Sequence, residues 1–119
     1  MATESDLTQQ RDNDVQVLDE KIMAAISIKN GLDVGDPQRV ELSTVINQLM
    51  DSRTDLHIQV LVADLNSSQL KAALAKIKKA GDDLKREAAK MKSATTFIGN
   101  ANAVIGAATN VINVFKKGG

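Results

Sequence analysis

Few residues in the chain could carry chemistry, and the single histidine, His57, is the first to consider. Its neighbours one helical turn away are Arg53 and Leu61, so no second metal ligand or orienting carboxylate shares its face. The chain also has no cysteine, which excludes disulfides, thiolate metal sites and cysteine nucleophiles. We therefore predict that His57 lies at a surface or an interface and takes no part in catalysis.

Two pairs of carboxylates have the four-residue spacing that places side chains on one face of a helix. They are Asp51 with Asp55, and Asp83 with Glu87. Such pairs are common on helix surfaces, and neither pair has a histidine on its face. They therefore indicate solvated charge rather than a general acid and base or a metal site.

One stretch with glycines and aspartates has a faint likeness to a calcium-binding loop. Asp33 and Asp36 lie beside Gly31 and Gly35, but the alternating acids and the closing glutamate of an EF-hand are absent. The chain also lacks the glycine-rich phosphate-binding motifs and the nucleophile-elbow motif. We predict that the protein is not an enzyme and takes no cofactor, metal ion or small-molecule substrate.

Composition then limits which elements could position any site. Of the 119 residues, 43% are hydrophobic and 25% charged, yet the only aromatic residues are Phe97 and Phe115 and the only proline is Pro37. Seven glycines and one proline cannot supply the turns of an all-β domain. The sequence predicts an all-α fold, either an antiparallel helical hairpin or a small helix bundle. We expect residues 1–10 to be disordered and residues 11–119 to form a single helical domain.

Apolar spacing and capping residues predict the first two helices. Apolar positions recur every three or four residues between about residues 12 and 30, and Gly31 ends that helix. Asp36 can cap the next helix, and Pro37 suits its first turn because proline lacks an N–H. The apolar stripe that follows predicts a second helix over about residues 37–65.

A third helix is predicted over about residues 68–117 by the most regular pattern in the chain. Large apolar residues recur at intervals of seven at Leu70, Ile77, Leu84, Met91, Ile98, Ile105 and Ile112. The positions three residues later carry Ala73, Ala80, Glu87, Ala94, Ala101 and Ala108. A strict seven-residue repeat predicts a coiled coil with left-handed supercoiling. We expect one long C-terminal helix, with a break at Gly99-Asn100 as the alternative.

The lengths of these helices predict their packing and leave one segment uncovered. The connector Asn66-Ser67-Ser68 is short, so the second and third helices are expected to pack as an antiparallel hairpin with the first helix alongside. At 1.5 Å per residue, the third helix would then extend roughly 30 Å beyond its partners and expose apolar residues. Three outcomes follow: the segment folds back as a fourth helix, pairs with the same segment of another copy, or engages a membrane or a different protein.

Charge divides the chain into two halves. Residues 1–66 hold 12 acids and 5 bases, and residues 67–119 hold 3 acids and 10 bases. Most of these bases form a basic face on the third helix: Lys71, Lys78, Lys79, Lys85, Arg86, Lys90 and Lys92. We expect a solvated or internally neutralised face, with contact to the acidic half of a neighbouring copy or to an anionic membrane as functional alternatives. A net charge of zero and the lack of aromatic residues among the bases argue against nucleic acid as a partner.

The segment from residue 93 to residue 115 contains no charged residue. Its asparagines and hydroxyls make it too polar for a constitutive transmembrane helix. We predict a non-enzymatic interaction or self-assembly protein that forms homo-oligomers through this segment. The expected interface consists of Ile98, Ala101, Ile105, Ala108, Ile112 and Phe115. The first alternative is a membrane-active or pore-forming protein that inserts residues 93–117 as an oligomer.

A loose resemblance supplies a second alternative. The sequence Gly35-Asp36-Pro37-Gln38, followed by Val40-Glu41-Leu42, joins two predicted helices and resembles the needle and rod subunits of bacterial type III secretion filaments. The resemblance covers at most residues 15–65, and the chain lacks the Pro-Ser-Asn-Pro type turn of that family. What the resemblance implies is a secreted filament subunit. The N-terminal sequence MATESDLTQQ has no apolar run, so we expect a cytoplasmic location, with signal-less secretion as the alternative.

Overall fold

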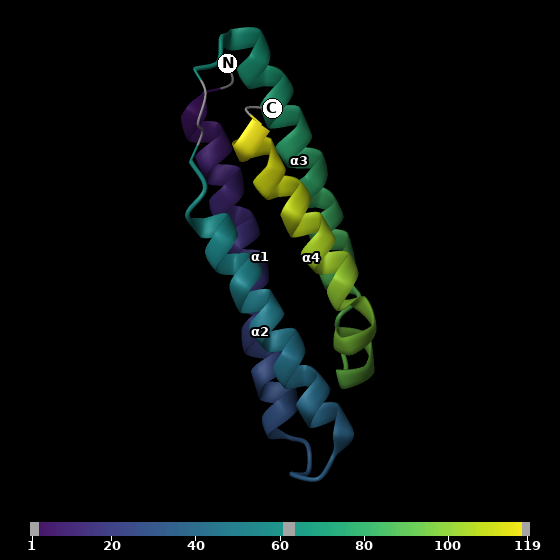
Figure 1. Ribbon diagram of the computed structural model, residues 1–119. Helices are drawn as coiled ribbons and strands as arrows, with labels where there is room; N and C mark the ends of the chain where they lie inside the picture. Colours follow the sequence, from purple (N-terminus) through teal and green to yellow (C-terminus); the bar gives the residue numbers. More distant parts are fainter. Residues whose placement is uncertain (1–2, 61–63, 118–119) are drawn as a thin grey trace.

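The computed structural model describes residues 3–60 and 64–117, and over these residues it contains four α-helices and no strand. The helices are α1 (Glu4–Asn30), α2 (Pro37–His57), α3 (Ser67–Ala89) and α4 (Ala94–Lys117). They pack lengthwise into a rod of 55 × 21 × 17 Å (Figure 1). The predictions of an all-α fold and of a small helix bundle are therefore confirmed.

The four helices form two antiparallel hairpins, α1 with α2 and α3 with α4 (Figure 1). The hairpins dock so that α1 lies beside α3 and α2 beside α4, and each of these pairs runs in one direction. Within the described residues, no Cα atom of α2 lies within 8 Å of one of α3, so these helices occupy opposite corners of the bundle. The predicted hairpin of the second and third helices is therefore wrong, although those helices do run in opposite directions.

The reason lies in the connection between α2 and α3. α2 ends at His57 instead of near residue 65, so the helix prediction is wrong for residues 58–60 and for residues 64–65. Residues 61–63 lie outside the described residues. A connection of this length allows α3 to start at the corner diagonal to α2, whereas a three-residue turn would have kept the two helices adjacent.

α1 begins earlier than predicted because Thr3 and Asp6 form a capping box. The Thr3 hydroxyl accepts a hydrogen bond from the Asp6 N–H at 3.3 Å, and the Asp6 carboxylate accepts one from the Thr3 N–H at 2.9 Å. Leu7 follows directly and is 1% exposed, so the first turn is also anchored in the core. Residues 4–10 are therefore helical rather than disordered, while residues 1–2 lie outside the described residues.

The loop between α1 and α2 has the predicted caps. The Asp36 carboxylate accepts a hydrogen bond from the Gln38 N–H at 2.9 Å, and the intervening proline is the first residue of α2. Arg39 reaches back and donates from Nη1 to the carbonyl oxygens of Lys29 at 3.2 Å and Leu32 at 2.9 Å. These bonds satisfy carbonyl groups at the end of α1 and fasten the two helices at the loop.

The predicted long C-terminal helix is in fact two helices, and the continuous rod is wrong. The chain reverses within residues 90–93, and Gly99-Asn100, the alternative break, lies inside α4. Ser93 starts α4: its Oγ accepts from the Thr96 N–H at 3.3 Å, and its carbonyl oxygen accepts from the Phe97 N–H at 2.9 Å. Of the three outcomes expected for this segment, the fourth helix is the one that the chain adopts.

The seven-residue repeat continued across this turn because α4 carries two neighbouring apolar columns. Phe97, Val104 and Val111 are at most 1% exposed and form the inner column. Ile98 and Ile105 continue the spacing from α3, but they are only partly buried at the edge of the core. An unbroken repeat of seven therefore could not distinguish one long helix from a hairpin.

The two hairpins are offset along the rod (Figure 1). Lys21 of α1 lies level with the α3–α4 turn, where its Nζ donates a hydrogen bond to the carbonyl oxygen of Met91 at 3.1 Å. The remainder of α1 and the loop to α2 extend beyond that turn, while α3 begins beyond the far end of α2 (Figure 1). Each hairpin thus has one end that the other hairpin does not cover.

Candidate interaction surface

The residues predicted to form an interface between copies lie largely inside the chain's own core. Four of them are at most 6% exposed: Ala101, Ala108, Ile112 and Phe115. Ile98 and Ile105 are partly buried and pack against the same core. α2 and α3 cover this side of α4, so the predicted interface is closed to a second copy in this conformation.

The outer face of α4 is exposed but carries no charge. It consists of Thr95, Thr96, Gly99, Asn102, Ala103, Gly106, Thr109 and Asn110. Among the residues that the structure describes, no helix combines the length and the apolarity that spanning a bilayer requires. The segment predicted to enter a membrane, residues 93–117, would have to leave the core of the bundle before it could do so.

The predicted basic face lies on the surface of α3 and the turn after it. All seven of its residues are exposed: Lys71, Lys78, Lys79, Lys85, Arg86, Lys90 and Lys92. Lys71 and Lys78 line a groove of about 770 Å³ between α3 and α1, whose other wall includes Asp6 and Asn13 of α1. Lys71 and Lys78 thus share a groove with Asp6, and the neutralisation of one half of the chain by the other stays a prediction.

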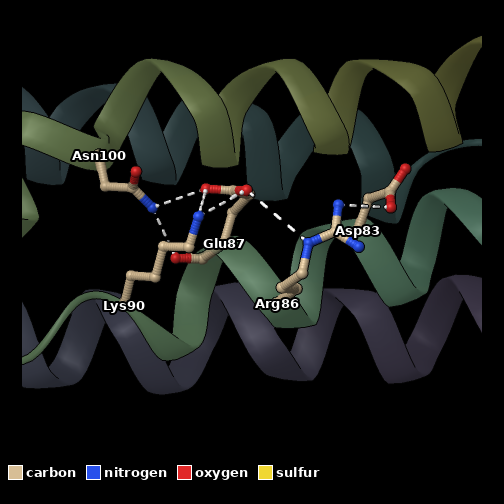
Figure 2. A network of polar contacts seen from close by, with 5 residues as sticks. All are labelled: Asp83, Arg86, Glu87, Lys90 and Asn100. Atoms are coloured by element: carbon tan, nitrogen blue, oxygen red, sulfur yellow. Dashed lines mark hydrogen bonds and ion pairs between the residues drawn. The ribbon is translucent and has the colours of Figure 1, made fainter.

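A network of polar contacts fastens α3 to α4 (Figure 2). Asn100 Nδ2 donates to the backbone oxygen of Glu87 at 2.7 Å and to its Oε2 at 3.2 Å. Lys90 pairs with the same carboxylate at 3.1 Å, and Arg86 pairs with Asp83 at 2.8 Å. The hydrogen bonds from Lys90 and then from Asn100 hold the pKa of Glu87 below its ordinary value, because they favour the ionised form.

The contact between α1 and α3 contains a carboxyl group without such partners. Asp14 is 1% exposed, and its Oδ2 has no hydrogen-bond partner. It faces Gly81 of α3, where an added Cβ would lie 2.8 Å from Asp14 Oδ1. Burial raises the pKa of Asp14 to about 7, while Lys85 lowers it and Asp82 raises it by smaller amounts. Asp14 was not among the candidate residues predicted from the sequence, although it lies one turn before Leu18 on the apolar face of the helix.

Four exposed large apolar side chains come from the residues around the loop between α1 and α2. Met23 is 69% exposed, Val34 87% and Val40 70%, and Ile26 is 36% exposed. They come from the last turns of α1, the loop and the first turn of α2. We define these four residues as the tip patch. No sequence pattern marked these four residues as one surface, because they come from two helices and the loop between them.

A second exposed apolar pair lies at the other end of α2. Ile58 and Val60 directly follow this helix and are each 64% exposed; we define them as the end patch. Between them, the backbone oxygen of Gln59 accepts a hydrogen bond from Arg11 Nη1 of α1, which holds the segment against the bundle. Because α2 has 21 residues, roughly 30 Å separates the two patches along the rod.

Comparison of the chain with family models, with curated proteins and with solved structures found no match in any of the three.

Proposed function

We propose that the protein is a non-enzymatic helical interaction protein that assembles end to end with copies of itself. The observation that carries the proposal is where its exposed apolar surface lies. Among the described residues, seven large apolar side chains are exposed, and all but Met50 belong to the tip patch or the end patch. Apolar surface gathered in this way is typical of contact with another polypeptide.

The two patches favour a second copy as the partner. They differ in composition and lie at opposite ends of α2, so the tip of one molecule can meet the end of the next while its own end patch stays open. Such a head-to-tail contact between identical molecules builds rings or linear chains. It uses a different surface from the α4 stripe that the sequence indicated.

Charge supports the same arrangement. The tip patch adjoins the acidic residues Asp33, Asp36 and Glu41. Near the end patch the exposed acids Asp55 and Asp64 occur together with the exposed Lys71. The acidic residues around the tip therefore oppose tip-to-tip contact, because like charges repel across an interface.

Sedimentation velocity over a range of protein concentrations tests the proposal. The full chain is expected to show a mass that rises with concentration, and Val34→Asp with Val40→Asp is expected to abolish this rise. Met50→Gln is the matched control, since Met50 is an exposed apolar residue outside both patches, and it should assemble like the natural chain. A natural chain that stays monomeric at every concentration overturns the proposal.

Mixing two deficient variants tests the head-to-tail geometry. A chain with the tip substitutions keeps its end patch, and a chain with Ile58→Asp and Val60→Asp keeps its tip patch. Neither should assemble alone, but the mixture should form dimers and nothing larger, because only one competent contact remains per pair. If the end variant assembles alone, the contact is tip to tip and the head-to-tail geometry is wrong.

Liposome co-sedimentation separates this proposal from the membrane-active alternative. Vesicles of anionic lipid are mixed with the full chain at low and at high salt. The self-assembly proposal expects no binding that survives high salt, because the uncharged side of α4 is buried in the core. Salt-resistant binding with release of a vesicle dye would instead favour insertion of residues 93–117.

A further inference from the structure

The contact between α1 and α3 buries a carboxyl group in surroundings that do not stabilise its negative charge. Asp14 is almost completely buried, and its Oδ2 lacks any hydrogen-bond partner. The room for this group exists only because α3 has a glycine at position 81, where a Cβ would lie 2.8 Å from Asp14 Oδ1. An unpaired carboxylate in such a place is strongly unfavourable, whereas the neutral acid is tolerated.

The charged groups of α3 near Asp14 do not compensate for its burial. Lys85 favours the ionised form and Asp82 opposes it, and both side chains are exposed to water. Burial remains the largest influence on this carboxyl group. Lys85 also lines a smaller groove of about 370 Å³ on the α1–α3 surface, together with Asn13 and Glu20 of α1.

The other helices that pack on α1 offer no cation to Asp14. Arg53 of α2 is engaged by Asp19 at 2.8 Å, and α4 carries no charged residue before Lys116. On α1 itself, the Arg11 guanidinium donates to the backbone oxygen of Gln59. The Lys21 ammonium donates to that of Met91. In the closed bundle Asp14 Oδ2 is therefore left without a hydrogen-bond partner.

We propose that the α1–α3 contact is a pH-sensitive seam, closed while Asp14 carries its proton and locally open when Asp14 is ionised. Opening would let water or the Lys85 ammonium reach the carboxylate. Two grooves lie on this contact, and their walls include the polar side chains of Asn13 and Glu20, so water reaches the edge of the seam. Asp14 and Gly81 belong to neither the tip patch nor the end patch, so this pH dependence is separate from the proposed assembly.

The direction of the pH effect follows from linkage. The pKa of Asp14 in the folded chain, about 7, lies above the ordinary value of 3.8. The folded state therefore holds this proton more tightly than the unfolded state, so stability is full below the ordinary value and is lost as pH rises through about 7. A difference of this size corresponds to at most roughly a thousandfold change in the folding equilibrium constant.

A carbon-13 NMR titration of the aspartate carboxyl groups tests the protonation step in the natural chain. One aspartate is expected to titrate near neutral pH, and its resonance should be absent from Asp14→Asn. Equilibrium unfolding at about pH 5 and about pH 8.5 then gives the linkage. The natural chain should lose stability at the higher pH, and Asp14→Asn should lose far less. Asp51→Asn, which removes an exposed aspartate of α2, is the matched control and should behave like the natural chain.

Amide hydrogen exchange, corrected for intrinsic rates, locates the opening. At the higher pH, exchange is expected to accelerate in the parts of α1 and α3 around Asp14 and Gly81, while α2 and α4 change little. Asp14→Asn should abolish this acceleration. An acceleration spread equally over all four helices, or an Asp14 carboxyl that titrates near its ordinary value, overturns the seam.

Discussion

The contacts of α3 with α4 and with α1 each contain a carboxyl group, and the pKa values of these two groups shift in opposite directions. On the side facing α4, Glu87 accepts hydrogen bonds from Lys90 and Asn100, and these hold its pKa low. On the side facing α1, Asp14 is buried against Gly81 without a partner for Oδ2, and its pKa is raised to about 7. The comparison teaches that one helix can be fastened by an acid on one flank and made sensitive to pH by an acid on the other.

The largest expected loss of stability is for a substitution in the apolar core. Phe97 is 1% exposed, so Phe97→Ala should lower the free energy of unfolding by about 3–5 kcal/mol, more than any change at either carboxyl group. Urea denaturation at neutral pH measures this. Ile98→Ala is the matched control, because Ile98 is only partly buried at the edge of the core. Equal losses for the two variants would mean that the inner column of α4 is not the one that holds the bundle.

The next largest effect is expected at Gly81. Gly81→Ala places a methyl group against the Asp14 carboxyl, and we expect a net loss of about 1–2 kcal/mol, because overpacking exceeds the gain in helix propensity. Thermal and urea unfolding measure it. In an Asp14→Ala background the same change should stabilise the protein, because the obstructing group is gone.

A second glycine controls for helix propensity. Gly106→Ala on α4 meets no atom within 4 Å, so it should stabilise the protein by about 0.5–1 kcal/mol. If Gly81→Ala stabilises the natural chain as much as Gly106→Ala does, a methyl group at position 81 does not clash with the Asp14 carboxyl.

On the opposite flank of α3, Asn100→Ala removes the bonds to the Glu87 carbonyl and carboxylate. We expect a loss of about 1–2 kcal/mol, because the Glu87 carboxylate loses one donor and its partly buried carbonyl oxygen keeps only the Lys90 N–H at 3.2 Å. Asn102→Ala, an exposed asparagine of the same helix, should change stability by less than about 0.5 kcal/mol in the same urea unfolding experiment. Equal effects of the two variants would contradict the role given to Asn100.

The smallest effect is expected for Glu87→Gln, and its pH dependence has the opposite sign to that of Asp14. A lowered pKa means that Glu87 stabilises the fold above its ordinary value, and that this contribution is lost as pH falls through the folded value. The difference in melting temperature between the natural chain and Glu87→Gln should therefore shrink between about pH 6 and about pH 3. A difference that grows on acidification would show that the carboxylate is not stabilised in its charged form.

The helix boundaries beside the α1–α2 loop were more predictable from the sequence than the end of α2 or the α3–α4 turn. The start of α2 was predictable because Asp36 supplies a capping carboxylate and the following proline lacks an N–H, and both are local properties of the chain. Neither the end of α2 at His57 nor the turn within residues 90–93 is marked by a glycine or proline. The helical spacing of apolar residues continues through both places in the sequence. Those ends depend on how the hairpins pack, which is a tertiary property.

The candidate sites were less predictable, although some signals were present. Glu87 is the one charged residue among the alanines of the predicted seam, and Asn100 drew attention as a break; the structure pairs the two. Asp14 could be recognised only by knowing that Gly81 lies opposite it, and the 66 residues between them in sequence contain two connections between helices. The tip patch depends on the offset between hairpins, which no pattern within one helix records.

The arrangement of the four helices also bears on how the chain folds. Within each hairpin, contacts join segments that follow one another in sequence, so the α1–α2 and α3–α4 hairpins can form early and independently. The parallel contacts of α1 with α3 and of α2 with α4 close much longer loops, and we expect them to form last. The final step of folding is then the docking of two preformed hairpins, and Asp14 must be buried during that step. Refolding should accordingly be faster in mildly acidic buffer, where this carboxyl group enters the interface already neutral.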